Sequence, residues 1–302
     1  MSALVYLGAF NGARFITDQI DSIVAQTQAC DLVVSDDGSH DATLQIVQSY
    51  AHRAPVELVS GPRQGFARNF LSVFERDSLN AYQWLAFADQ DDLWDPDHLC
   101  RGINALEGVC GPAVWGGRTR LIDSDGRVFG ESTNRGERLG FANALIQSFA
   151  GGNTLVLNRD AIVFLSALLN DSGAFCNWAS HDWAIYQLIS LAGGTVVFDS
   201  EPSVSYRQHG QNHVGQNRSV RARAHRMMRL FDGSFGAQLD KQATELVSPL
   251  VRRHMTSESQ AIFEAYEWAR KHRGWRGIQG LRSVGIRRES ALETLAFELA
   301  FA

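Results

Sequence analysis

The stretch Trp84-Leu85-Ala86-Phe87-Ala88-Asp89-Gln90-Asp91-Asp92 joins an almost continuous apolar run to an acidic cluster. The apolar run predicts a strand that is buried on both faces, as in a parallel sheet covered by helices. The cluster places three carboxylates within four residues directly after that strand. Because ligands of open α/β sheets bind beyond the carboxyl ends of the strands, this stretch predicts both a fold class and the position of a site.

The residues on either side extend the α/β pattern. Short apolar runs predict strands at 4–7, 32–35 and 56–59, and helical periodicity lies between them, as in βαβ units with a mostly parallel sheet. Further strands are expected near 113–116, 153–157 and 195–198, and helices near 160–169 and 181–191. We therefore expect a domain over 1–214, with halves 1–110 and 111–214, followed by a basic helical region over 215–302.

Composition restricts the class of protein. The chain has 302 residues, of which 45% are hydrophobic and 20% charged, as is typical of a globular protein. Its four cysteines are scattered without metal-ligand spacing, which favours a reducing compartment. The N-terminal residues lack a signal-peptide pattern, and no run of about 18 apolar residues predicts a spanning helix. These features predict a cytoplasmic protein.

The charge is distributed unevenly along the chain. Residues 1–214 carry 13 basic and 24 acidic side chains, whereas residues 215–302 carry 15 basic and 9 acidic ones. Arginines interleaved with apolar residues between Arg218 and Arg229 are typical of a helix that lies on the inner face of an anionic membrane. A solvated helix packed against the rest of the protein is the alternative. Nucleic-acid binding is disfavoured because the main body is acidic.

Two acidic clusters carry the predicted chemistry. Asp89, Asp91 and Asp92 repel one another unless a cation offsets their charge, and carboxylates with substrate phosphates are the ligands that Mg²⁺ and Mn²⁺ prefer. The alternative is a solvated turn before the next helix. Asp36-Asp37-Gly38-Ser39 is either a turn that caps a helix or a carboxylate site for a nucleobase or ribose.

Several ordered motifs resemble family 2 glycosyltransferases. The N-terminal ones are Val5–Gly12, Gln19–Thr27, Val34–Thr43 and Phe87–Trp94. Later ones resemble the acceptor half of the rhamnosyltransferase-like branch: Gly151-Gly152-Asn153-Thr154, His181-Asp182-Trp183 and Tyr206–Asn212. The resemblance extends over roughly residues 3–215. It implies a GT-A fold, that is, a Rossmann-like nucleotide-binding α/β domain.

The resemblance also implies roles for individual residues. Asp182 lies where the family has its catalytic base, while Asp91 and His209 are expected at the metal. Contacts to the nucleotide are expected from Ala9, Asn11, Asp36, Asp37, Arg68, Asp89 and Gln90. Contacts to the donor or acceptor sugar are expected from Asp92, Trp94, Gly151, Gly152, Asn153, His181 and Trp183.

Together these features predict a metal-dependent inverting glycosyltransferase. The preferred hypothesis is transfer of L-rhamnose from dTDP-rhamnose to a hydroxyl of a growing surface polysaccharide, such as an O-antigen, with a lipid-linked acceptor as one form. A UDP-hexose or UDP-N-acetylhexosamine donor is one alternative, and a non-catalytic sugar-nucleotide or polysaccharide-binding module is another. A nucleotidyltransferase is disfavoured because no Gly-rich basic phosphate loop follows the first strand.

Overall fold

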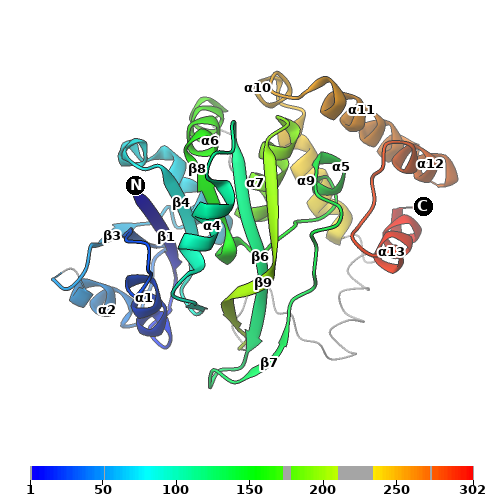
Figure 1. The fold of residues 1–302 in the computed structure, drawn as a ribbon. Coiled ribbons are helices and arrows are strands. Elements are labelled where there is room, and N and C mark those ends of the chain that lie inside the picture. The colour runs from blue at the N-terminus through cyan, green and yellow to red at the C-terminus, as the bar shows by residue number, and fades with distance from the viewer. Residues whose placement is uncertain (1, 51, 173–177, 210–233, 273, 302) are drawn as a thin grey trace.

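A computed structural model describes residues 2–50, 52–172, 178–209, 234–272 and 274–301 (Figure 1). The N-terminal half alternates strands and helices, as the sequence predicts. Its elements are β1 (Ala3–Ala9), α1 (Ile16–Val24), β2 (Asp31–Asp36), α2 (Thr43–Tyr50), β3 (Val56–Ser60), α3 (Phe66–Leu71), the 3₁₀ turns η1 (Ser72–Glu75) and η2 (Asp77–Ala81), and β4 (Trp84–Asp89).

Residues 93–207 depart from the simple alternation of strands and helices. Its elements are β5 (Leu93–Trp94), α4 (His98–Leu106), β6 (Ala113–Ile122), β7 (Val128–Glu131), α5 (Phe141–Ala144), η3 (Gly152–Thr154), β8 (Val156–Asn158), α6 (Arg159–Ser172), α7 (His181–Leu191) and β9 (Thr195–Arg207). The strand expected at 153–157 is thus a 3₁₀ turn followed by the shorter β8. Strands β6 and β9 continue well beyond their predicted ends.

Over the described residues the strands form one sheet in the order β3-β2-β1-β4-β8-β6-β9-β5, with β7 paired to β6. Strands β1 to β4 are mutually parallel, whereas β8 is antiparallel to both β4 and β6. The predicted parallel sheet therefore holds for the N-terminal half, and the rest is mixed. The chain crosses from β3 at one edge back to β4 beside β1, which creates a topological switch point between β1 and β4.

Side chains of the central strands alternate between two apolar layers. Tyr6 and Phe87 pack into the layer on one face of the sheet, while Leu7 and Ala88 pack into the layer on the other. All four are at most 1% exposed. This two-sided burial explains the continuous apolar run that the sequence shows at β4.

The C-terminal residues form a set of helices at the opposite end of the molecule from α1 and α2 (Figure 1). These helices contribute side chains to the larger apolar layer. They are α9 (Ser234–Leu246), α10 (Pro249–Arg252), α11 (Ser257–Lys271), α12 (Trp275–Ser283) and α13 (Ala291–Phe301). Leu246, Phe263 and Phe297 are at most 2% exposed and belong to the same core cluster as Phe87. The basic segment Arg218–Arg229 lies outside the described residues, so membrane contact through it stays a prediction, as does a boundary near 214. No helix in the described part of the chain has the length and apolar character required to cross a bilayer.

Candidate active site

The ends of β1 and β4 are joined by one side-chain amide at the switch point. Gln90 Oε1 accepts a hydrogen bond from the Phe10 backbone N–H at 2.8 Å, and Gln90 Nε2 donates one to the Phe10 carbonyl at 3.0 Å. A Cβ atom at Gly12 would lie 2.1 Å from the same Oε1, so only glycine fits this close approach. Gln90 therefore fixes the loop after β1 against the acidic loop after β4.

The loops after β1 and β2 are tied together through Asn11. Its backbone N–H donates to Ser39 Oγ at 2.8 Å, and its side-chain Oδ1 accepts from the His40 N–H at 2.8 Å. The Asn11 backbone has φ 51°, a left-handed conformation that asparagine tolerates better than most residues. Ala9, the last residue of β1, accepts a hydrogen bond at its carbonyl from the Asp37 N–H at 2.8 Å.

The two aspartates after β2 have different roles. Asp37 accepts hydrogen bonds from the N–H groups of Arg63 at 2.6 Å and Gly65 at 2.9 Å, so it holds the loop after β3. Asp36 uses only Oδ2, which accepts from the N–H groups of Gly38 and Ser39 at 3.0 and 2.9 Å. Its other oxygen, Oδ1, is buried without a hydrogen-bond partner among the described residues. Asp36 Oδ1 is therefore an unsatisfied buried acceptor in this loop, whereas both Asp37 oxygens are engaged.

Arg68 lies in α3, beside the loop that Asp37 holds. Its Nη2 pairs with Glu75 Oε1 at 2.7 Å, and its side chain is 19% exposed. The structure thus shows an intramolecular partner for Arg68, and the predicted nucleotide contact stays a prediction.

The acidic loop after β4 concentrates negative charge. Burial raises the pKa of Asp89 to about 7, and repulsion by the carboxylates of Asp91 and Asp182 adds to the rise. Burial likewise raises the pKa of Asp91, although its hydrogen bond to His209 and the charge of that ring oppose the effect. Asp89, Asp91 and Asp182 thus lie close enough to interact electrostatically, although they come from two separate parts of the chain.

His209 completes the exposed side of this loop. Its Nε2 lies 2.7 Å from Asp91 Oδ2, and the two side chains are 12% and 14% exposed. The His209 ring also packs against Phe15 with centroids 5.0 Å apart. The pair that the resemblance assigns to a metal is therefore adjacent, and both members are accessible from solvent.

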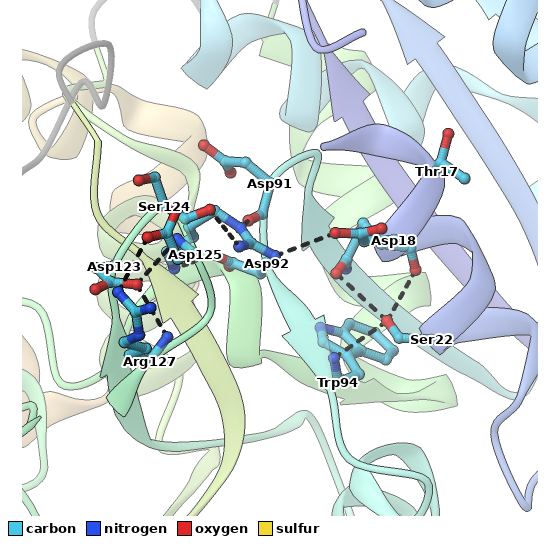
Figure 2. A network of polar contacts seen from close by, with 12 residues as sticks. Thr17, Asp18, Ser22, Asp91, Asp92, Trp94, Asp123, Ser124, Asp125 and Arg127 are labelled. Carbon is cyan, nitrogen blue, oxygen red and sulfur yellow. Dashed lines mark hydrogen bonds and ion pairs between the residues drawn. The ribbon is translucent and has the colours of Figure 1, made fainter. Parts of the chain in front are cut away.

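Arg207, which the sequence analysis did not assign, organises the acidic loop. Its backbone N–H donates to Asp92 Oδ1 at 3.0 Å, and its guanidinium donates to the carbonyls of Asp91 at 2.9 Å and Ser124 at 3.2 Å. The same guanidinium pairs with Asp18 at 3.4 Å and is almost fully buried. Figure 2 shows Asp91 and Asp92 between Asp18 of α1 on one side and Asp123–Arg127 on the other.

Asp182 lies in the first turn of α7 and has one clear partner. Its Oδ2 accepts a hydrogen bond from Ser148 Oγ at 2.7 Å. Ser148 lies in the segment before η3, so this segment orients the Asp182 carboxylate. Ser148 was not among the predicted residues, because its partner lies 34 positions away and no local motif marks it.

Five side chains that were expected to contact a sugar are buried in this structure, and their predicted contacts stay predictions. Trp94, Asp92, Asn153, His181 and Trp183 are at most 6% exposed. Trp183 Nε1 donates to the Ala144 carbonyl at 2.6 Å, and its ring stacks on Phe235, so it offers no free face to a sugar. Trp94 lies in the core beside His98, with ring centroids 4.3 Å apart.

The other three buried residues, Asp92, Asn153 and His181, make contacts within the protein next to the acidic loop and η3. Asp92 accepts a hydrogen bond from Asn153 Nδ2 in addition to the one from Arg207, and burial keeps its pKa well above the ordinary range. His181 stacks on Phe70 with centroids 4.0 Å apart. Gly152 lies against this imidazole, because a Cβ there would be 2.2 Å from its Cε1 and Nε2 atoms. Gly151 and Gly152 thus form the turn that admits His181.

The described residues contain no group of three or more His, Cys, Asp or Glu side chains arranged to hold a metal on their own. Asp91 and His209 provide two candidate ligands. Sites for Mg²⁺ often use one or two carboxylates and take the remaining ligands from substrate phosphates and water. The donor set is therefore compatible with a cation that binds together with a diphosphate.

The fold and this site define the class of protein. Residues 5–165 match the model of Glycosyl transferase family 2, and the chain belongs to this family. The predicted GT-A fold and the family resemblance are both confirmed.

Individual relatives narrow the comparison. The chain is 25% identical to dTDP-rhamnosyl transferase RfbG of Shigella flexneri over 73% of this chain and 78% of that protein. Among solved structures, residues 1–349 of TarS of S. aureus in complex with UDP-GlcNAc have a TM-score of 0.57 at 15% identity, over 94% of this chain and 80% of that one. Mannosyltransferase PcManGT of Pyrobaculum calidifontis, in complex with GDP-Man and Mn2+, has a TM-score of 0.50 at 17% identity, over 97% of this chain and 86% of that one.

Proposed function

We propose that this family 2 glycosyltransferase moves a sugar from a nucleoside-diphosphate donor to an acceptor hydroxyl with inversion, and that the donor is dTDP-L-rhamnose. The observation that supports the proposal is that Asp89, at the end of β4, interacts electrostatically with Asp91 in the loop after it and with Asp182 in the first turn of α7. The likeness to a dTDP-rhamnosyl transferase supports the choice of donor. A growing surface polysaccharide, such as an O-antigen, is the proposed acceptor, with a lipid-linked form included.

The loops on the β1 to β3 side would hold the nucleoside. Asp36 Oδ1 is the acceptor that the fold leaves without an internal partner in the described residues, and a base N–H or a ribose hydroxyl satisfies it. Asn11, Gln90 and Asp37 keep the surrounding backbone in place through the hydrogen bonds described above.

The acidic loop would hold the diphosphate end of the donor. Asp91 and His209, whose Oδ2 and Nε2 atoms lie 2.7 Å apart, are the residues that would bind Mg²⁺ or Mn²⁺. A divalent cation supplies positive charge that stabilises the departing nucleoside diphosphate. Arg207 keeps the Asp91 and Asp92 backbone fixed while charge develops on the leaving group.

Asp182 would act as the general base on the acceptor side. An acceptor hydroxyl must lose its proton as it attacks the anomeric carbon, and one positioned carboxylate is sufficient to accept it. Ser148 orients this carboxylate through Oδ2 and leaves Oδ1 for the acceptor. A single in-line displacement of this kind inverts the anomeric configuration.

The first experiment measures donor binding and product formation. Thermal shifts with dTDP, UDP and GDP, each with and without Mn²⁺, identify the base, because a ligand that binds only the folded state raises the melting temperature. We expect the largest shift with dTDP and Mn²⁺. Product analysis with dTDP-L-rhamnose and saccharide acceptors then tests the transfer. A preference for UDP would instead favour a hexose or N-acetylhexosamine donor.

Two substitutions separate the proposed roles. We expect Asp91→Asn to abolish the Mn²⁺-dependent part of the thermal shift together with transfer. Asp182→Asn is expected to keep donor binding and to lose about 100-fold or more in kcat. Asp125→Asn is a matched control, because this carboxylate lies near the site but is 63% exposed. Wild-type turnover in Asp182→Asn would refute the role of Asp182 as the base. If the wild-type protein showed no transfer and no donor hydrolysis, a non-catalytic binding module would be favoured.

A further inference from the structure

Helix α13 turns an apolar face outward. Leu292, Leu295 and Leu299 are 79%, 50% and 60% exposed. Their spacing of three and four residues places them on one face of the helix. A surface helix normally directs its apolar stripe toward the core and its polar residues toward water, so α13 has the opposite arrangement on this side.

The polar residues of α13 face the protein instead. Glu298 is 4% exposed and accepts two hydrogen bonds from Arg282, through Nε at 2.7 Å and Nη2 at 2.5 Å. Glu293 lies 3.7 Å from Arg288 Nε. Thr294 Oγ1 accepts from the Arg288 backbone N–H at 3.0 Å. These polar contacts, together with Phe297 in the core at 2% exposure, anchor the helix and fix the orientation of the leucines.

A basic pocket adjoins the leucines. It has a volume of about 350 Å³, and Arg138, Arg282, Arg287 and Arg288 line it together with Leu295. Glu298 is the one acidic residue in the lining. Trp275, 63% exposed on α12, lies under the Arg282 guanidinium at 5.8 Å from the ring centroid. Leucine, tryptophan and arginine are thus exposed together on neighbouring helices.

We propose that this leucine–arginine surface, formed by Leu292, Leu295, Leu299, Trp275 and the four arginines, binds the surface of an anionic phospholipid bilayer. The leucines enter the boundary between headgroups and acyl chains, and Arg138 and Arg287 contact lipid phosphates. Arg282 and Arg288 are paired with Glu298 and Glu293, so the positive charge of Arg138 and Arg287 is what favours a negatively charged surface over an uncharged one. The proposal depends neither on the identity of the sugar donor nor on the residue that acts as the general base.

Vesicle co-sedimentation of the full chain tests the proposal. Wild-type protein is expected to bind vesicles of phosphatidylcholine and phosphatidylglycerol more tightly than vesicles of phosphatidylcholine alone, and less tightly as salt is raised. The triple variant L292S/L295S/L299S is expected to lose about tenfold or more in partition coefficient. R138Q/R287Q is expected to lose about tenfold on anionic vesicles and little on neutral ones.

A second triple variant is the matched control. Val24 on α1, Val163 on α6 and Val247 directly after α9 are 47%, 48% and 38% exposed, and V24S/V163S/V247S is expected to bind vesicles like the wild type. An unchanged melting temperature for each variant shows that folding is intact. Wild-type protein that ignores anionic vesicles, or a leucine variant that binds as tightly as the wild type, would overturn the proposal. It would also be overturned if light scattering showed that the leucines instead hold two copies together without lipid.

Discussion

At the scale of single residues, the site depends on buried partners that hold its charged groups. Ser148 and Arg207 provide hydrogen bonds to Asp182 and to the Asp91–Asp92 backbone, respectively. Neither partner belongs to an acidic motif. The reactive groups could be recognised from their charge pattern, whereas the residues that orient them could not.

Replacing Ser148 by alanine tests its positioning role. Without the hydroxyl, the Asp182 carboxylate rotates more freely, and we expect kcat to fall about tenfold while KM for the donor stays unchanged. Ser148→Thr retains the hydroxyl and should restore most of the rate. Steady-state kinetics at saturating acceptor measures this. An increase in donor KM with kcat preserved would contradict a role on the acceptor side.

Replacing His98 tests the cost of burying a neutral imidazole. Burial lowers the pKa of His98 to about 3, and the charge of Arg101 adds to this. The unfolded chain therefore binds a proton on this group between about pH 6.5 and 3 that the folded chain does not. The free energy of unfolding should fall as pH decreases through that range, by up to about 1.4 kcal/mol per pH unit.

The substitution His98→Asn keeps a polar group near Ser203 Oγ, which lies 2.8 Å from His98 Nδ1, but removes the titration. We expect the variant to be less stable than the wild type at pH 7 and to lose less stability on acidification. Urea unfolding at several pH values measures the difference. The exposed His52→Asn serves as the control, and parallel profiles for wild type and His98→Asn would contradict the argument.

Charge patterns allowed the sequence to select residues that lie near one another in the fold. Asp89, Asp91, Asp182 and His209 were all selected from motifs; Asp89 interacts electrostatically with Asp91 and Asp182, and His209 contacts Asp91. Trp94 and Trp183 are buried and satisfy packing needs that a sequence does not show. Arg207 is a residue of a motif that the sequence analysis quoted, but its partner Asp92 lies 115 positions away.

At the scale of elements, turns and periodicity predicted the βαβ half well because both are local. Helix α7 begins and ends where the apolar pattern does, and β1 to β4 are each within two residues of their predicted bounds. Strand β5 has only two residues, and β9 contains a register shift opposite Gly117–Thr119. Such elements arise from pairing between distant segments, so no local pattern predicts them.

The contact between η3 and α7 can be tested with one glycine. In Gly152→Ala the added methyl would lie 2.2 Å from the His181 ring, so the first turn of α7 must move. We expect a loss of about 1–3 kcal/mol in stability and a lower kcat, because that turn carries Asp182.

Gly236→Ala is the matched control for this substitution. Gly236 lies in α9, and a Cβ there meets no atom within 4 Å. Its expected effect is a gain of about 0.5–1 kcal/mol, since alanine favours a helix over glycine. Chemical denaturation measures both variants. Equal effects of the two substitutions would contradict a special role for the contact between Gly152 and His181.

At the scale of the whole molecule, the C-terminal helices share a core with the sheet. We therefore expect a single unfolding transition when the protein is followed by tryptophan fluorescence and by far-UV circular dichroism. Phe263 is 1% exposed on α11. Phe263→Ala should lower the free energy of unfolding by about 3–5 kcal/mol, and both signals should report the same decrease. Two transitions, with only one affected, would show that residues 234–301 unfold separately.

The hold of Arg207 on the acidic loop also has a consequence for biosynthesis. Strand β4 and the acidic loop after it are synthesised before residue 100, but Arg207, which fixes that loop, is added more than a hundred residues later. A nascent chain therefore carries the acidic loop before it is able to hold that loop in place. We expect the nascent chain to become able to bind a donor only late in synthesis, once β9 has joined the sheet.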